Sequence, residues 1–351
     1  MNVGLVTTSF PRHAGDYAGS FVGDRVQRLL ADGHSVEVIA AGDGGPAREI
    51  EHERLTVTRI AAPHPGNEGL FYGAGAPEAL EGGGAAIWFA AARFTAALAA
   101  AVRARAHRFE VVESHWLVPS ALAAVAGAPG CRQRAYAHSG DVALLERIPF
   151  GRTIARRLVR AGIAFHFVSD ELATRFAALA GAARPLGAVT PLSPPADDWS
   201  PRTGADAMGR RQLGLARPTV LAVGRLVPIK GHDRLLRACA RAQTGRGAPG
   251  ALEVVILGDG PERLRLGRLA ADLGVRLRLP GFVPRAEVAR WLRACDVYVQ
   301  PSVRLANGRG EGAPLATAEA RAVGIPVLVD SDVGRLAEGL RRGLHLEDTG
   351  V

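Results

Sequence analysis

The chain has 351 residues, of which 48% are hydrophobic, so it can bury more than one core and is not a disordered polymer. Its formal net charge is +9. Residues 1–200 hold 19 arginines against 19 acidic residues, whereas residues 201–351 hold 23 arginines and one lysine against 15 acidic residues, so the second part carries all of the excess. Such a basic region fits an anionic small ligand or an acidic membrane surface. Nucleic acid is disfavoured as a partner, because only 5% of residues are aromatic and no nucleic-acid-binding motif is present.

The cysteines and the N-terminal residues bear on the compartment. The three cysteines are odd in number and far apart in sequence, which is typical of a reduced protein without a disulfide framework. Met1–Ser9 lacks the basic start and apolar core of a signal peptide. We therefore expect a cytoplasmic protein. The apolar run Ala85–Val102 is rich in alanine and interrupted by Arg93, and we interpret it as a helix of a soluble domain.

Strands and helices alternate from the N-terminus. A short strand is expected at Val3–Thr7, followed by a loop through Gly19, a helix near Phe21–Asp32 and a strand from Ser35 to Ile39. This order is typical of a parallel, doubly wound sheet. Further strands of the same domain are expected at 109–113, 134–137 and 166–168.

A proline-rich stretch interrupts this alternation. Pro191, Pro194, Pro195 and Pro201 fall within eleven residues, which indicates an extended connector. We therefore predict a first domain over residues 1–190, a linker over 191–204 and a second domain over 205–351.

The second domain repeats the pattern. Strands are expected at 220–223, 252–257, 276–279, 297–299 and 326–329, with helices at 232–242, 262–273, 287–293 and 314–323. Two doubly wound α/β domains would face each other across a cleft at the carboxyl ends of their strands, where open α/β sheets bind ligands.

Lys230 is the only lysine of the chain, although lysine and arginine together number 43. It follows the strand 220–223 in the turn Gly224-Arg225-Leu226-Val227-Pro228-Ile229-Lys230-Gly231, a strand–turn–helix arrangement that suits a phosphate. The alternative is a chance survivor of a strong arginine bias. The turn is not a Walker A loop, and Gly258-Asp259-Gly260 is not a dinucleotide fingerprint, because Arg263 occupies its third glycine position.

A second segment combines glycine and glutamate. Gly310 and Gly312 flank Glu311, and Pro314 suits the first position of a helix that contains Glu319. The backbone amides near Gly312–Leu315 would then form a helix N-terminus suited to a phosphate, and the two glutamates could hold a sugar and a ribose. The alternative is that the glutamates only interact favourably with the helix dipole.

Together these motifs resemble the GT-B glycosyltransferases, specifically the retaining glycosyltransferase family 4. The resemblance covers about residues 1–335. It is carried by the order of several motifs: the Gly19 loop, Ala137-His138-Ser139-Gly140-Asp141-Val142, Gly224-Arg225…Lys230-Gly231, Gly258-Asp259-Gly260-Pro261, Asp296–Ser302 and Glu311…Glu319.

The resemblance implies a fold, a reaction and roles for these residues. The fold would be GT-B, with two Rossmann-like domains, and the reaction would be transfer of a sugar from a nucleotide-diphosphate sugar to an acceptor hydroxyl. Arg225 and Lys230 would neutralise the diphosphate, Glu311 would face the donor sugar, and Glu319 would bind the ribose. His138 would lie at the reacting centre, and Gly19, Gly312, Ala313, Pro314 and Leu315 would help bind the donor. His115 could equally shape the acceptor side or be structural.

Members of this family generally work without a divalent metal, so neither a metal nor a cofactor is expected. The acceptor would be a sugar or a lipid-linked glycan, and a cytoplasmic protein peripheral to the inner face of an anionic membrane is an open alternative. The family normally continues beyond Gly334 with a helix that returns to the first domain, whereas this chain ends at Val351. The resemblance therefore also allows a catalytically inactive nucleotide-sugar-binding or partner subunit with a shortened C-terminus.

Overall fold

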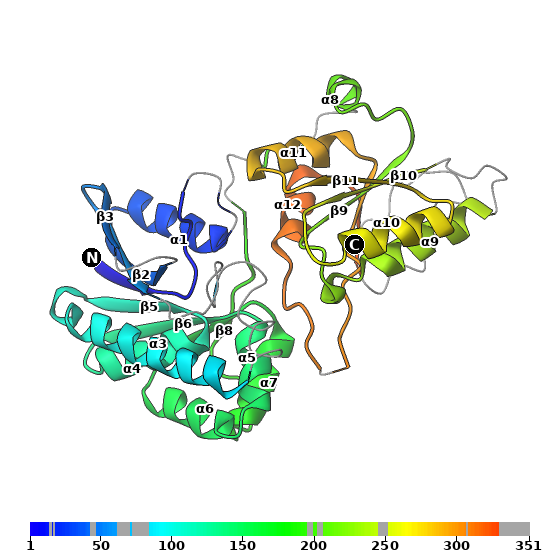
Figure 1. The fold of residues 1–351 in the computed structure, drawn as a ribbon. Helices are drawn as coiled ribbons and strands as arrows, with labels where there is room; N and C mark the ends of the chain where they lie inside the picture. Colours follow the sequence, from blue (N-terminus) through cyan, green and yellow to red (C-terminus); the bar gives the residue numbers. More distant parts are fainter. Residues whose placement is uncertain are drawn as a thin grey trace. The chain divides into compact units, whose positions relative to one another are not determined.

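The computed structural model describes residues 1–13, 16, 18–42, 47–61, 71, 84–194, 199–201, 206–244, 252–306 and 308–329. The contacts within the chain divide it into two compact units, Met1–Pro191 and Leu192–Val351. Each unit has its own sheet with helices packed against it (Figure 1). The prediction of two α/β domains is thereby confirmed. The expected shortening after Gly334 concerns residues that lie outside those described.

The first unit contains an eight-stranded sheet in the order β3-β4-β2-β1-β5-β6-β7-β8. The pair β3 and β4 is antiparallel, and every other pair of neighbours is parallel. The strands are β1 Asn2–Val6, β2 Ser35–Gly42, β3 Ala47–His52, β4 Leu55–Ala61, β5 Val111–His115, β6 Arg132–Ala137, β7 Ala164–Phe167 and β8 Ala188–Val189. The sequence did not predict the hairpin of β3 and β4, because half of the six residues in β3 are charged and no apolar run marks it.

Helices cover both faces of this sheet. Helix α1 lies on one face and α3 on the other (Figure 1). Val22, Val26 and Leu29 of α1 and Phe94 and Leu98 of α3 pack against the sheet. The helical segments of the unit are α1 Ser20–Ala31, α3 Ala85–Arg103, a short 3-10 turn Ala106–Arg108, a π-turn Leu117–Ala121, α4 Leu122–Gly127, α5 Gly140–Arg147, α6 Gly151–Arg160 and α7 Asp170–Ala180.

Helix α3 is long and apolar enough, by composition, to cross a membrane. It instead contributes Phe94, Leu98 and Val102 to the core of the first unit and packs beside α4. A single helix of this composition is weak evidence for a membrane span.

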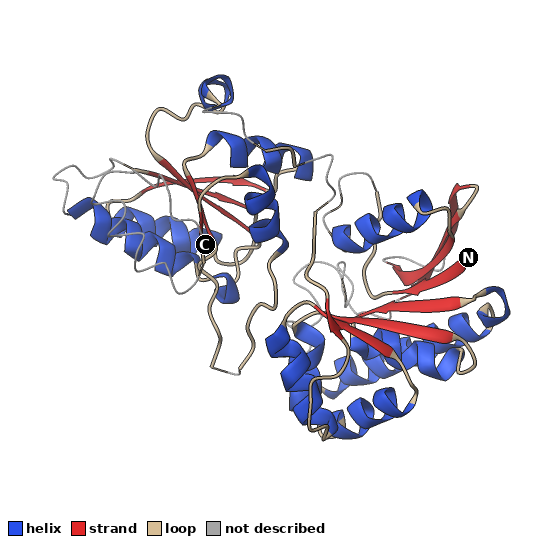
Figure 2. Cartoon of the chain, turned by 180° about the vertical axis from the view of Figure 1, so that it is seen from behind, coloured by secondary structure: helices blue, strands red, loops and turns tan. Residues whose placement is uncertain are grey.

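The second unit contains a five-stranded parallel sheet in the order β11-β10-β9-β12-β13. Figure 2 shows strands in red and helices in blue. Along β9, Val220 and Ala222 face one core and Leu221 faces the other, as expected for a strand covered on both sides. The elements are α8 Ala207–Gln212, β9 Thr219–Val223, a 3-10 turn Pro228–Lys230, α9 His232–Thr244, β10 Glu253–Leu257, α10 Arg263–Asp272, β11 Arg276–Gly281, α11 Arg285–Ala294, β12 Val297–Val299, α12 Leu315–Val323 and β13 Val327–Leu328.

The predicted linker 191–204 is only partly described, because residues 195–198 and 202–205 lie outside the described ranges. Trp199 is 2% exposed and packs with Leu221 and Trp291 in a core of the second unit. This part of the stretch therefore belongs to the second unit rather than to an extended connector.

A buried ion pair joins α1 to the central strand β5 of the first unit. Arg25 donates two hydrogen bonds to Glu113, Nε to Oε1 at 2.6 Å and Nη2 to Oε2 at 2.9 Å. Burial alone would raise the pKa of Glu113, but the hydrogen bonds and charge of Arg25 outweigh it and hold this pKa at about 2. Glu113 is therefore ionised inside the core.

We predict that Arg25→Met lowers the free energy of unfolding by about 3–5 kcal/mol near neutral pH, because it removes both guanidinium hydrogen bonds of a buried carboxylate. Among the described residues, the cationic contact that remains is the longer one with Arg134, at 4.0 Å. The contribution of the pair is fully present above the unfolded pKa of Glu113 and is lost as the pH falls toward 2. The gap between wild type and variant, measured by denaturant unfolding, should therefore shrink as the pH falls. The exposed Arg28→Met serves as the control, and an equal loss there would contradict the prediction.

Candidate functional site

The motifs singled out in the second unit meet at one edge of its sheet. Strands β10, β9 and β12 are neighbours and parallel, so the loops that follow them start side by side. Gly224 N donates to Leu257 O, and Leu226 N donates to Asp259 O, each at 2.9 Å. Val303 N donates to Ile229 O, also at 2.9 Å, which joins the loop after β12 to the Lys230 turn.

Two glycines permit this close approach of backbones. Gly258 has φ 141°, and a Cβ there would lie 2.1 Å from Gly224 O. Gly231 has φ 63°, and a Cβ there would lie 2.1 Å from Pro301 O. Both positions combine a backbone conformation that L-residues disfavour with no room for a side chain. These glycines of the predicted motifs therefore hold the three loops together.

Lys230 forms an ion pair with Glu311, with 2.6 Å between Nζ and Oε1. Its stem passes over Gly224, where a Cβ would lie 2.8 Å from Lys230 Cε. An ammonium carries three donors, so within the described part of the chain two N–H groups of Lys230 remain for other acceptors. The structure thus brings together two residues that the sequence assigned to different parts of one ligand.

Glu311 is also held from its other side, by two residues for which the sequence predicted no role of their own. Glu311 Oε2 accepts hydrogen bonds from Gln300 Nε2 at 3.0 Å and from Ser302 Oγ. The buried Tyr298 donates its hydroxyl hydrogen to Gln300 Oε1, which fixes the amide. Burial, with the negative charges of Glu311 and Glu319, raises the pKa of Tyr298 well above 10, so the phenol stays a neutral donor. Tyr298, Gln300 and Ser302 lie in the motif Asp296–Ser302, which is part of the family resemblance. That motif was the one sequence feature that could have pointed to these residues.

Glu319 lies on α12 and is 5% exposed. Its Oε1 accepts a hydrogen bond from Arg285 Nε at 3.0 Å, at the first residue of α11. The Arg285 guanidinium in turn lies over the Trp199 ring, 5.6 Å from its centre. This partner could not be predicted from the sequence, because nothing distinguishes Arg285 among 42 arginines. The predicted contact of Glu319 with a ribose stays a prediction.

The N-terminus of α12 differs slightly from the expected one. Pro314 has ψ 122° and caps the helix, so the first helical residue is Leu315 rather than Pro314. Thr317 N donates to Pro314 O at 3.0 Å. The backbone N–H groups of Gly312, Ala313 and Leu315 lie at this end, and all three residues are partly exposed.

Two further basic side chains belong to the Lys230 turn. Arg225 is partly buried and follows β9 directly after Gly224. His232 is fully buried, and burial together with the charge of Lys230 lowers its pKa to about 4. His232 is therefore neutral at pH 7 and adds no positive charge to that of Arg225 and Lys230.

In the first unit, His138 follows β6 and His115 ends β5, and the two rings stack with 5.4 Å between centres and 13° between planes. His115 Nδ1 and His138 Nε2 are 3.2 Å apart. Burial, with the charge of His115, holds the pKa of His138 well below 6.5. The Phe21 ring lies 4.8 Å from that of His138, centre to centre. His138 is thus a neutral, nearly buried hydrogen-bonding group, and the structure brings His115 to it.

Asp141 organises the turns around these histidines. Its carboxylate accepts hydrogen bonds from the backbone amides of Leu117 at 2.8 Å, His138 at 3.0 Å and Val142 at 2.9 Å. Complete burial nevertheless raises the pKa of Asp141 to about 7. In the sequence, Asp141 stood out only as part of a motif. The structure shows that it holds three backbone amides in place.

Gly19 has φ 70° and precedes α1. A Cβ at this position would lie 2.3 Å from Ser9 O. Glycine is therefore required for the turn that leads into α1 and Phe21. The predicted contact of Gly19 with a ligand stays a prediction. Within the described residues, no group of three His, Cys, Asp or Glu side chains could hold a metal ion.

Comparisons with known proteins cover both units. Residues 18–193 match the model of the glycosyl transferase 4-like domain, and residues 209–346 match that of the glycosyl transferases group 1. The chain is 31% identical over 233 residues to a GDP-mannose-dependent alpha-(1-6)-phosphatidylinositol monomannoside mannosyltransferase of Mycolicibacterium smegmatis, covering 64% of this chain and 59% of that protein. The chain thus spans about three-fifths of this relative's length.

Solved structures show the same fold. Sucrose-phosphate synthase from Thermosynechococcus elongatus superimposes with a TM-score of 0.73 at 18% identity, covering 98% of this chain and 89% of that one. The Anabaena protein HepE, solved in complex with UDP and glucose, gives a TM-score of 0.66 at 18% identity, covering 99% and 90%. These likenesses establish a two-domain Rossmann-like GT-B fold.

We predict that Lys230→Arg weakens binding of a free nucleoside diphosphate by about tenfold or more, because a planar guanidinium cannot keep the ammonium's place over Gly224 and beside Glu311. Titration calorimetry with UDP, GDP and ADP measures this. The exposed Arg237→Lys on α9, the reverse exchange, is the control and should bind as wild type does. Wild-type affinity in the Lys230→Arg variant would show that this position does not require lysine.

Proposed function

The chain belongs to glycosyltransferase family 4, and from this membership we propose that it is a retaining, metal-independent transferase that moves a sugar from a nucleotide-diphosphate sugar to an acceptor hydroxyl. The observation that carries the proposal is the ion pair of Lys230 with Glu311, 2.6 Å apart, at the point where three loops of the second unit converge. It sets a phosphate-binding cation beside a carboxylate that can accept sugar hydroxyl hydrogens.

The charges of this site suit the reaction. When the bond between the anomeric carbon and the diphosphate oxygen breaks, the electron pair leaves with the diphosphate and positive charge develops on the sugar. Arg225 and the two remaining N–H groups of Lys230 would stabilise the departing diphosphate, which is where fixed cations lower a barrier most. The acceptor oxygen then bonds to the anomeric carbon, and its proton passes to an oxygen of the departing diphosphate.

The remaining residues would bind and orient the donor. Glu311 would accept hydrogen bonds from the sugar, and Glu319, held by Arg285, would accept them from the ribose. The amides of Gly312, Ala313 and Leu315 would donate to phosphate or sugar oxygens. In the first unit, the neutral His138 would contact the donor sugar at the reacting centre, with Gly19 shaping the loop before α1.

The acceptor we propose is a glycan or a lipid-linked glycan. The Mycolicibacterium smegmatis relative is named for a phosphatidylinositol monomannoside and for GDP-mannose, which supports an acceptor of this kind. We place the protein in the cytoplasm, at the inner face of the membrane, and we do not propose a nucleic-acid partner.

The reaction is tested by mixing the chain with UDP-, GDP- and ADP-sugars and a lipid-linked or glycan acceptor in saturating EDTA, and measuring release of the nucleoside diphosphate. We expect turnover without added metal, because Arg225 and Lys230 supply the positive charge that a metal ion supplies elsewhere. Lys230→Ala should reduce it on the order of 100-fold.

Activity that vanishes in EDTA and returns with Mg²⁺ would contradict the metal-independent mechanism. Nucleotide-sugar binding without turnover would favour the alternative, an inactive binding or partner subunit.

Variants of the two glutamates should distinguish binding of the nucleotide from binding of the sugar. We predict that Glu319→Ala weakens binding of the free nucleoside diphosphate about tenfold, since ribose contacts form in ground and transition states alike. Glu311→Ala should bind the free nucleotide as well as wild type or better, because it removes a carboxylate 2.6 Å from Lys230. It should instead lose recognition of the intact donor. Calorimetry measures both, with thermal unfolding as the folding control, and equal losses would refute the assignment.

A further inference from the structure

Helix α6 in the first unit carries a row of exposed arginines. Its buried side consists of Gly151, Ala155 and Leu158, and its exposed side holds Arg152, Arg156, Arg157 and Arg160. The helix contains no acidic residue. Among the described residues, none of these four arginines makes an ion pair with a carboxylate, and Arg156 donates to the backbone oxygen of Ala180 at 3.4 Å. Their charge is therefore uncompensated. This local positive charge does not appear in the net charge of residues 1–200, because 19 acidic residues balance the 19 arginines there.

An aromatic side chain stands at the start of this helix. Phe150 immediately precedes Gly151 and is 72% exposed. A Cβ at Gly151 would lie 1.6 Å from Leu145 O, so the end of α5 and the start of α6 are in backbone contact. This contact fixes the turn from which Phe150 projects, next to the first arginine of the row.

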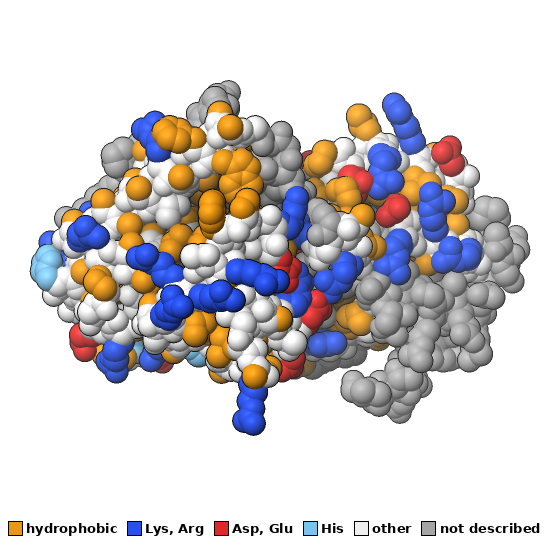
Figure 3. Space-filling model, turned by 90° about the horizontal axis from the view of Figure 1, so that it is seen from below, with side chains coloured by type: hydrophobic (Ala, Val, Ile, Leu, Met, Phe, Trp, Pro, Cys, Tyr) orange, Lys and Arg blue, Asp and Glu red, His pale blue; other side chains and the backbone are white. Residues whose placement is uncertain are grey.

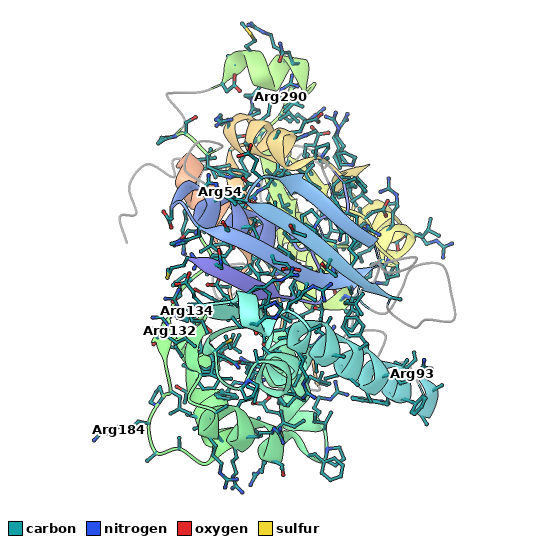
Figure 4. All side chains as sticks on the ribbon, turned by 90° about the vertical axis from the view of Figure 1, so that its left-hand side faces the viewer. Arg54, Arg93, Arg132, Arg134, Arg184 and Arg290 are labelled. Atoms are coloured by element: carbon teal, nitrogen blue, oxygen red, sulfur yellow. The ribbon has the colours of Figure 1, made fainter. Side chains whose placement is uncertain are left out.

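Helix α3 presents an apolar face to the surface. Its most apolar 18-residue window has a mean hydropathy of 1.7, yet only 22% of that window is buried. Trp88 is 41% exposed and Phe89 is 65% exposed. A surface helix of a globular domain normally exposes polar residues on this side. Here Arg93, which extends outward from α3, adds a further cation (Figure 4).

The topology brings these features to one side of the first unit. Helix α3 leads into β5 and α6 leads into β7, so both helices run against the strands and start at the carboxyl edge of the sheet. Helix α4 packs against both of them. Seen from below, this unit shows arginine and hydrophobic side chains next to one another (Figure 3). The same sheet edge holds His115 at the end of β5 and His138 after β6.

We propose that this surface, formed by the four arginines of α6, Phe150 and the exposed face of α3, docks on an anionic phospholipid bilayer. Arginines attract acidic headgroups, and each contributes to binding near such a surface. Tryptophan and phenylalanine partition into the headgroup region beneath them. The docked chain would present the carboxyl edge of the first sheet near the lipid surface. The proposal does not depend on the proposed sugar transfer, because binding to vesicles is measured without a nucleotide sugar.

The test uses the full chain and vesicles of phosphatidylcholine, with or without phosphatidylglycerol, in a sedimentation assay. We expect binding to the anionic vesicles only. Raising the salt from about 0.1 M to about 1 M shortens the Debye length from about 10 Å to about 3 Å and should release the protein. Equal binding to neutral vesicles, or no binding to anionic ones at low salt, would overturn the proposal.

A charge-matched pair of variants localises the surface. The test variant combines Phe150→Ser, Arg152→Gln and Arg157→Gln, and should partition on the order of tenfold or more weakly. The control combines Leu264→Ser, Arg237→Gln and Arg268→Gln, which removes one exposed apolar side chain and two exposed arginines from the second unit. It should bind as wild type does. Equal loss in both variants would show that net charge, not this surface, governs binding.

Trp88 supplies a second readout, because it is the one exposed tryptophan of four, the others being partly or fully buried. Anionic vesicles that contain brominated lipid should quench its fluorescence, and Trp88→Phe should abolish most of this quenching while vesicle binding remains. Undiminished quenching in that variant would overturn the placement of α3 on the bilayer.

A second copy of the chain could bind the same surface, and sedimentation velocity without lipid tests this alternative. A dimer that the test variant dissociates would assign the surface to a second copy of the chain instead. Nucleotide affinity should be the same in both variants, which separates failure of this proposal from failure of the proposed reaction.

Discussion

Backbone contacts that only glycine permits hold the loops of the second unit together. Gly258 lies against the carbonyl of Gly224, and Gly231 lies against that of Pro301. Because the backbones touch, each loop fixes the position of the next, and the stem of Lys230 is held over Gly224. The position of the Lys230 ammonium therefore depends on glycine at these positions, because a side chain there would clash with the neighbouring loop. A cation on a mobile loop would have to be ordered when a phosphate binds, whereas this one is ordered already.

In the same loops, the negative charge of Glu311 is balanced by the positive charge of Lys230 and by neutral hydrogen-bond donors. Glu311 faces the ammonium of Lys230 with one oxygen and two neutral donors with the other, so its charge is fully hydrogen-bonded. Tyr298 and His232, both buried beside it, stay neutral for opposite reasons: burial raises the pKa of the phenol and lowers that of the imidazole. The site therefore concentrates its charge on a few groups at its surface, where a diphosphate would meet them.

Much of this arrangement could be predicted from the sequence, and the reason is local. Apolar runs marked β9, β10 and β12, with glycine directly after the first two. Parallel strands in one sheet put their ends at one edge, so Lys230 and the motifs after β10 and β12 had to converge. Contacts made by side chains far apart in the chain left no such signal. The pairing of Arg285 with Glu319, and of Arg25 with Glu113, joins residues that nothing in the sequence distinguishes from other arginines. The hairpin of β3 and β4 escaped prediction because the charged residues of β3 hide its period.

The carboxyl edges of the two sheets carry different kinds of side chain. In the second unit the edge carries paired charges, which suits recognition of a diphosphate. In the first unit the edge carries stacked neutral rings, His115 on His138 and on Tyr136, with Glu113 buried beneath and paired with Arg25. Neutral imidazoles can donate and accept hydrogen bonds without attracting a counter-ion. Keeping them neutral requires the buried environment that lowers their pKa. The burial of this histidine pair therefore keeps positive charge off this edge of the first sheet, whereas the corresponding edge of the second sheet carries Arg225 and Lys230.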